Sequence, residues 1–156
     1  MRVAYQAIDP TSGNHLRQRP PIVLTNSDRN SLLVLLRTAV NDIEPSIARF
    51  LSEEVERADI VSTEISPTAV VSIGSTVKFI DHAAMKIRQV KLVFPDEAND
   101  VGHISVTEAL GSALVGLGPG QTITWHEDQT ERQITVLATS LPDPNQRYGQ
   151  VEIAEI

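Results

Sequence analysis

Two carboxylates, Asp42 and Glu44, stand close together between two stretches of helical periodicity. Acids at the tip of a helical hairpin can help to hold a magnesium ion, because hard cations prefer carboxylate oxygens. Capping offers a second interpretation, since an aspartate suits a turn and a glutamate just before a helix is favoured by the helix dipole. We favour this second interpretation, because capping and the dipole alone account for both residues.

No other pattern in the chain predicts catalysis. The four histidines, at positions 15, 82, 103 and 126, are scattered without the spacing of metal ligands. The sequence contains no GxSxG elbow, no Walker A loop, no GxGxxG and no cysteine. Gly116–Gly120 is rich in glycine but follows a predicted helix, which is the wrong context for phosphate binding. We therefore predict no catalytic residue, no metal, no cofactor and no enzymatic activity.

The composition is that of a soluble globular protein. Hydrophobic residues make up 41% of the 156 residues, charged residues make up 21%, and the net charge is −7. This charge disfavours broad attraction to nucleic acid and fits contact with a basic protein surface. The chain has no run of about 20 apolar residues that could span a membrane. It has no signal-peptide pattern either, so we expect a cytoplasmic protein, and we expect a monomer.

The first half of the chain has helical periodicity. A first helix is predicted to start near Ser27-Asp28, which are good N-cap residues, and Asn41-Asp42 ends it. Pro45 suits the first turn of a second helix. Two such helices with a short loop should lie antiparallel, as a helical hairpin or short coiled coil, with arms of about 14 residues and about 21 Å. We expect the acids of the second arm to lie on its solvated face: Glu53, Glu54 and Glu56.

After a linker at 61–68 the period changes. The next segments alternate or are rich in β-branched residues, which predicts strands. The strands are expected at Val71–Phe79, Ile87–Phe94, His103–Val106, Thr122–Trp125 and Gln133–Ala138, and a short helix at Glu108–Leu117. The first of them is expected to contain a turn or bulge at Gly74-Ser75, and the second to be buried. An antiparallel sheet that carries one helix makes an α+β domain.

The chain therefore divides into four parts. The first part is an extension, whose alternative is an edge strand at Val3–Ile8, and the last is a tail in which Val151–Ile153 could add a strand. The parts are the extension at 1–21, the hairpin at 22–66, the α+β domain at 67–140 and the tail at 141–156.

Four ordered motifs in the α+β domain resemble the C-terminal domain of the Gre transcript-cleavage factors. VSIGSTV at 71–77 is similar to their VSxGSxV entry, and LVFPDEA at 92–98 is similar to their LVGPDEAD segment. Residues 102–117 resemble GxISVxSPLGxALLG, and Gly118–Gln121 stands where xVGD is expected. Each motif alone is weak, but four with the right order and spacing are a strong signal.

The first half narrows the resemblance to the Rnk proteins, regulators of nucleoside diphosphate kinase. IVLTNSDRNSLLVLL at 22–36 and ARFLSEEVERADIV at 48–61 look like the two arms of their short hairpin. The resemblance covers about residues 21–140. It leaves the N-terminal extension and the tail unaccounted for.

The resemblance implies both a fold and a partner. The α+β domain would be FKBP-like and would dock at the rim of the RNA polymerase secondary channel, with the hairpin pointing into the channel. Glu108-Ala109 departs from the Ser-Pro pair of the Gre pattern. The docking face would comprise Asp96, Glu97, Thr107, Glu108, Ala109, Leu110 and Gly111.

The implied function is that of a polymerase-binding regulator that competes with Gre factors without cleaving RNA, because its hairpin is too short. Two alternatives stay open. One is a cleavage factor that uses Asp42 and Glu44, although their spacing departs from that of the Gre acidic pair. The other is an FKBP-type prolyl isomerase, for which the domain offers few aromatic residues: Phe79, Phe94 and Trp125. No sequence-specific contact with nucleic acid and no membrane contact are expected.

Overall fold

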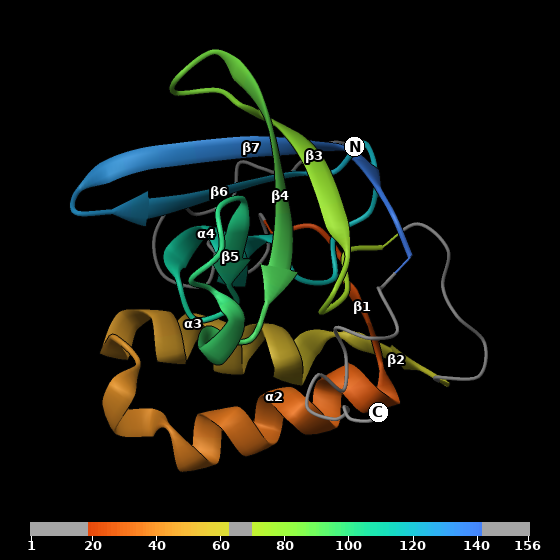
Figure 1. The fold of residues 1–156 in the computed structure, drawn as a ribbon, viewed down its shortest axis with the longest axis vertical. Coiled ribbons are helices and arrows are strands. Elements are labelled where there is room, and N and C mark those ends of the chain that lie inside the picture. Colours follow the sequence, from red (N-terminus) through yellow and green to blue (C-terminus); the bar gives the residue numbers. More distant parts are fainter. Residues whose placement is uncertain (1–18, 63–69, 142–156) are drawn as a thin grey trace, which may run out of the picture.

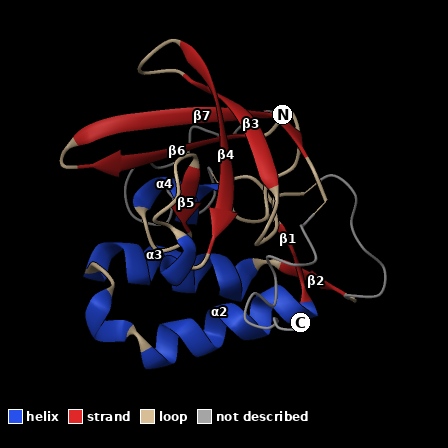
Figure 2. Cartoon of the chain, in the orientation of Figure 1, coloured by secondary structure: helices blue, strands red, loops and turns tan. Residues whose placement is uncertain are grey.

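The computed structural model describes residues 19–62 and 70–141, and its elements are shown in Figure 1. It is a mixed α+β fold, as the sequence predicts, with the two long helices on one side and a curled sheet on the other (Figure 2). Most of the predicted extension, the predicted tail and the candidate strands at Val3–Ile8 and Val151–Ile153 lie outside the described residues. Within the described ranges, none of the helices has the length and apolar character that a membrane crossing requires.

Helices α2 (Asn26–Thr38) and α3 (Pro45–Arg57) form the helical layer. Helix α2 begins earlier than the Ser27-Asp28 prediction, because the Thr25 hydroxyl accepts a hydrogen bond from the Asp28 N–H at 3.0 Å and caps the helix. It ends at Thr38, and a 3₁₀ turn, η2 (Val40–Asp42), follows. Each helix has 13 residues, which gives a length of about 20 Å. Figure 1 shows α3 between α2 and the sheet.

Two short strands that the sequence did not reveal flank these helices. Strand β1 (Val23–Thr25) leads into α2, and strand β2 (Asp59–Val61) follows α3. They pair in parallel, with Val23 opposite Asp59. A parallel pair needs a crossover connection, and the two helices supply it. The predicted linker at 61–68 thus starts inside a strand, and residues 63–69 are outside the described residues.

The five-stranded sheet is mixed, and the prediction of an antiparallel sheet is wrong at one edge. Its order is β5-β4-β3-β7-β6, and β4 pairs with β5 in parallel. The reason is the connection between the two strands, which contains the 3₁₀ turn η3 (Pro95–Glu97). It is not a tight hairpin turn, and it leads the chain back so that β5 runs in the same direction as β4. The strands are β3 (Thr76–Asp81), β4 (Lys86–Val93), β5 (His103–Ser105), β6 (Thr122–Glu127) and β7 (Thr130–Thr139).

Three further predictions need correction in this domain. The first strand begins only at Thr76, because the buried residues Val71–Ser75 include the turn expected near Gly74, whose φ of 97° suits glycine. The first half of β4 is exposed, with Ile87 64% accessible, because the β3–β4 hairpin extends past the core. Helix α4 (Ala109–Leu114) is shorter than expected, because Val115 already has an extended backbone.

The helices and the sheet share one hydrophobic core. Leu32, Leu51 and Val55 from the helices belong to the same buried cluster as Phe79 and Leu114. Asp28 at the start of α2 is also buried, and its carboxylate accepts a hydrogen bond from the Ile73 N–H at 3.2 Å. The helical pair is therefore seated on the sheet domain along its length.

Glu54 corrects the expectation of a solvated acidic face on the second arm. Its side chain is 1% exposed, and it accepts hydrogen bonds from two guanidinium groups. Arg57 donates from Nε and Nη2 at 2.8 Å, and Arg19 donates from Nη1 at 2.9 Å. Arg19 also lies over the Phe50 ring, 4.3 Å from its centroid. This cluster fastens residue 19 to α3.

We expect Glu54→Gln to destabilise the protein by about 3 kcal/mol, because removing one member of a buried ion cluster leaves the others uncompensated. Chemical denaturation at neutral pH measures this loss. The matched variant is Glu53→Gln, whose side chain is 37% exposed and forms an ion pair with Arg19 at 3.0 Å. An exposed pair of this kind should cost less than about 1 kcal/mol. Equal losses in the two variants would contradict the structural role of Glu54.

Candidate partner-binding surface

The parallel pairing of β4 and β5 brings two separate loops to the same end of the sheet. Val93 stands opposite Ser105, and the Val106 N–H donates to the Val93 carbonyl at 2.9 Å. Because parallel strands end on the same side, the segment after β4 and the segment after β5 lie side by side. Five of the predicted docking residues occupy this end of the sheet: Asp96, Glu97, Thr107, Glu108 and Ala109.

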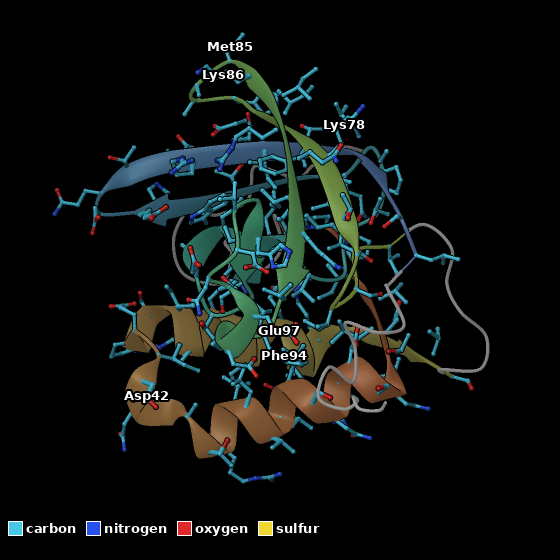
Figure 3. The ribbon with its side chains drawn as sticks, in the orientation of Figure 1. Asp42, Lys78, Met85, Lys86, Phe94 and Glu97 are labelled. Carbon is cyan, nitrogen blue, oxygen red and sulfur yellow. The ribbon has the colours of Figure 1, made fainter. Side chains whose placement is uncertain are left out.

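The loop after β4 presents one exposed and one partly buried carboxylate. Pro95 starts the turn η3, which leaves Asp96 exposed and Glu97 partly buried beside Phe94 (Figure 3). The Glu97 Oε1 atom is buried and has no hydrogen-bond partner among the described residues. Burial, and after it the negative charge of Asp96, raises the pKa of Glu97. Lys91 and His103 offset part of this effect, so the carboxylate of Glu97 is only partly compensated in the free protein.

The loop after β5 is held by its own hydroxyl and carboxylate groups. The Thr107 N–H donates to Ser105 Oγ at 3.0 Å, and the two hydroxyls lie 2.7 Å apart. The Glu108 carboxylate turns back and accepts a hydrogen bond from the Ser105 N–H at 3.3 Å. Glu108 is exposed, yet its carboxylate is already engaged in the fold.

Gly111 has a packing role in the fold. It is buried, and a Cβ at this position would lie 1.9 Å from the Ser105 carbonyl oxygen. Only a residue without a side chain lets α4 approach β5 so closely. Ala109 and Leu110 are half-buried on the same helix. Gly111 therefore positions the surface indirectly, by holding α4 against the end of β5.

The acids of the helix loop belong to a different place. Asp42 is exposed at the outer end of the helical pair, apart from Glu97 (Figure 3). Glu44 caps α3, because its Oε1 accepts hydrogen bonds from the Ser46 N–H at 2.9 Å and the Ile47 N–H at 3.2 Å, and from the Ser46 hydroxyl. The Ser46 hydroxyl and then the Ile47 N–H lower the pKa of Glu44. Capping, the interpretation favoured above, is what the geometry of Glu44 shows.

The residues with the most elaborate contacts are ones that the sequence did not single out. Asp81 is 3% exposed and accepts hydrogen bonds from the N–H groups of Ala83 and Ala84. Its other oxygen lies 3.3 Å from Arg132 Nη2 and 3.6 Å from Arg88 Nη1. For Glu54 the arginine three residues later was a visible signal, since i and i+3 share a helix face. For Asp81 the bonds to Ala83 and Ala84 are local, but its arginine partners lie 7 and 51 residues away, so no short stretch of sequence indicated the ion pairs.

Among the described residues, no three histidine or acidic side chains gather in an arrangement that could hold a metal ion. The surface at the ends of β4 and β5 therefore offers polar contacts and exposed loops. Such a surface suits the recognition of another macromolecule.

Comparison with known proteins identifies the family. Residues 66–140 match the family model of the transcription elongation factor GreA/GreB C-terminal domain, and residues 20–61 match the Rnk N-terminus. The regulator of nucleoside diphosphate kinase from Escherichia coli (strain K12) is 34% identical over 108 residues, which cover 69% of this chain and 79% of that protein. The protein of the same name from Shigella flexneri matches equally well. The chain belongs to the Rnk family.

A solved structure supports the fold of this Rnk-family chain. The prokaryotic transcription elongation factor GreA/GreB from Nitrosomonas europaea superposes with a TM-score of 0.62 at 28% sequence identity. The match covers 78% of this chain and 98% of that one. The predicted Rnk resemblance is thus confirmed, and with it the description of the protein as a member of a family related to transcription elongation factors.

Glu97→Gln should stabilise the protein at neutral pH and leave it unchanged in acid. Folding raises the pKa of the Glu97 carboxyl, so the group stabilises the fold fully only below its ordinary pKa of 4.5. This contribution is lost as the pH rises through the higher pKa of the folded state. The glutamine of the variant stays neutral, so the melting temperature of the variant should exceed that of the native protein at pH 7, and the difference should vanish in acid. Thermal melts across this pH range measure it.

The exposed Glu56 provides the matched control for this series. Glu56→Gln removes the same charge from a solvated position and should give a small difference at every pH. A Glu97→Gln difference that does not depend on pH would show that its carboxylate is not destabilised by its surroundings.

Proposed function

We propose that this protein is a transcription regulator that binds RNA polymerase at the rim of the secondary channel and competes there with Gre factors. The observation that carries the proposal is the convergence of the loops after β4 and β5, in a domain that matches the GreA/GreB C-terminal family. In this proposal the domain is FKBP-like and acts as the anchor, and the α2–α3 hairpin, a short coiled coil, points into the channel.

The chemistry of the surface favours a basic partner. Asp96 is exposed, and Glu97 beside it has a buried oxygen without a partner. A cationic group of a partner would compensate that carboxylate and lower its pKa again. Thr107 and Leu110 flank the acids with hydroxyl and aliphatic groups. Glu108 and Gly111 hold the loop and the helix in place, so their contribution to binding is indirect.

The helix loop favours binding without transcript cleavage. The Glu44 carboxylate is engaged by the N-terminus of α3, which leaves Asp42 as the free-standing acid of the candidate pair. Each arm reaches only about 20 Å. A prolyl isomerase gains no support from the structure, since Phe79 is 0% exposed and cannot line a pocket for a proline ring.

Asp96→Lys should weaken competition with a Gre factor for core RNA polymerase by tenfold or more. The exposed carboxylate becomes a like charge opposite a basic surface, and such a change mainly costs binding and not folding. The measurement is displacement of a fluorescent Gre factor from the polymerase by increasing concentrations of each variant. Glu56→Lys is the control, because it makes the same charge change at an exposed site on α3.

Three outcomes of this competition are informative. Displacement by the native protein and by Glu56→Lys, with loss in Asp96→Lys, supports the proposed face. Equal displacement by the native protein and both variants would show that Asp96 does not take part in the contact, which would then lie elsewhere on the molecule. Failure of the native protein to displace the Gre factor at micromolar concentration rejects a shared site.

Backtracked elongation complexes test the second half of the proposal. The native protein should leave the length of the nascent RNA unchanged under conditions in which a Gre factor shortens it, because the hairpin offers no free pair of acids. Shortening that disappears in an Asp42→Ala, Glu44→Ala double variant would instead identify a cleavage factor.

A further inference from the structure

The β3–β4 hairpin carries all the lysines of this acidic protein. Lys78, Lys86 and Lys91 are the only lysines among the 156 residues, whose net charge is −7. Residues 76–93 contain these three lysines and Arg88 against a single acid, Asp81, which is buried and lies 3.3 Å from Arg132 and 3.6 Å from Arg88. Figure 3 shows Met85 and Lys86 at the end of the hairpin that lies farthest from the helices, on the side opposite Asp42. A positively charged surface thus projects from a negatively charged molecule.

The outer side of this hairpin is an open strand edge. Strand β4 pairs with β3 from Lys86 to Lys91, but β5 covers only Lys91–Val93 on the other side. Within the described ranges no strand pairs with that side of Lys86–Val90. An uncovered edge is a template for the addition of another strand.

The hydrogen bonds at the covered end show which groups face the open edge. The Lys91 N–H points toward β5 and donates to the Gly102 carbonyl at 2.8 Å, whereas the Leu92 N–H points the other way and donates to the Ser75 carbonyl at 3.0 Å. Peptide groups alternate along a strand, so the main chain of Ile87 and Gln89 faces the same side as Lys91. These two residues offer their N–H and C=O groups at the open edge.

The side chains beside this edge differ between the two faces of the strand. Lys86 and Arg88 lie on one face, and Ile87 and Gln89 lie on the other, because side chains alternate along a strand. Ile87 is 64% exposed and Met85, at the turn, is 79% exposed. Lys91, and Lys78 opposite Gln89, lie on the same face as Ile87. A strand added here would therefore meet positive charge on both faces and an exposed apolar side chain on one.

We propose that the open edge of β4, at Ile87–Gln89, binds an extended acidic segment of a partner protein by strand addition. Main-chain hydrogen bonds would supply the attachment, and acidic side chains on alternate positions would face Lys86 and Arg88. A second copy of the chain fits less well, because it would bring together two edges that carry the same positively charged side chains. Single-stranded nucleic acid fits less well, because the hairpin has no exposed aromatic ring for base stacking: Phe79 is 0% exposed.

The test uses the full chain, labelled with ¹⁵N, and an acetylated and amidated octapeptide of alternating glutamate and valine. Amide resonances of Ile87 and Gln89 should shift during the titration, and their hydrogen exchange should slow. The same peptide with lysine in place of glutamate should not bind. A version N-methylated at every residue keeps its charges but has no N–H groups, and it should bind at least tenfold more weakly.

Protein variants separate the contribution of charge to peptide binding from the contribution of main-chain hydrogen bonds. Lys86→Glu should weaken binding of the glutamate–valine peptide at least tenfold, and Arg49→Glu, the same charge change at an exposed site on α3, should not. Gln89→Pro removes the edge N–H and should abolish binding, whereas Gln89→Ala keeps it and should bind normally. Asp96→Lys, on the surface proposed to bind polymerase, should also bind the peptide normally. Loss of peptide binding at the β4 edge and loss of polymerase binding can therefore be told apart.

The proposal is overturned if Ile87 and Gln89 do not respond to millimolar peptide, or if the N-methylated peptide binds as well as its parent. Preferential binding of a 15-nucleotide oligothymidylate would likewise overturn it in favour of nucleic acid. In the first case the lysines serve only to protect the edge from pairing with other strands.

Discussion

One close approach of backbones, at Gly116, holds the two halves of the molecule together. The Val23 N–H donates to the Gly116 carbonyl at 3.1 Å, and the Gly116 N–H donates to the Val71 carbonyl at 2.8 Å. A Cβ on residue 116 would lie 2.8 Å from the Ile22 Cβ, and its φ of 85° is one that other residues resist. Glycine is required here for two independent reasons, and β1, the turn before β3 and the end of α4 meet only because it is present.

This junction and the shared core fix the orientation of the helical pair relative to the sheet domain. Because Leu32, Leu51 and Val55 share the core of the sheet domain, the direction of α2 and α3 is fixed relative to the loops after β4 and β5. If a hinge joined the two halves, a partner could bind only the fraction of molecules in which both halves had the right relative orientation. A shared core presents the helix loop and the sheet end as one rigid template, and pre-organisation of this kind reduces the entropy lost on binding.

The sequence predicted the elements whose signals are local. Pro45 and Glu44 marked the start of α3, and β-branched runs located the strands, because capping and periodicity act over a few residues. It missed β1 and β2, which are three residues long and exist only because they pair across 36 positions, Val23 with Asp59. The parallel pairing of β4 with β5, and the burial of Glu54 by Arg19, are also long-range, so no window of sequence contained them. The docking residues came from motif resemblance, and periodicity could not have shown that Gly111 packs while Asp96 is exposed.

The arginines that bind buried acids and the lysines occupy different parts of the molecule. Arginines hold the buried acids: Arg19 and Arg57 on Glu54, with side chains 13% and 22% exposed, and Arg132 on Asp81, 26% exposed. The guanidinium fork suits such sites because it can bind a carboxylate through two N–H groups and is weakly hydrated. The lysines are confined to the β3–β4 hairpin. Since the charges of these three arginines are offset by their acidic partners, the hairpin stands out as a concentration of positive charge on a protein with a net charge of −7. A molecule polarised in this way is oriented by a charged partner before contact, with the hairpin turned toward acidic surfaces and the loops after β4 and β5 turned toward basic ones.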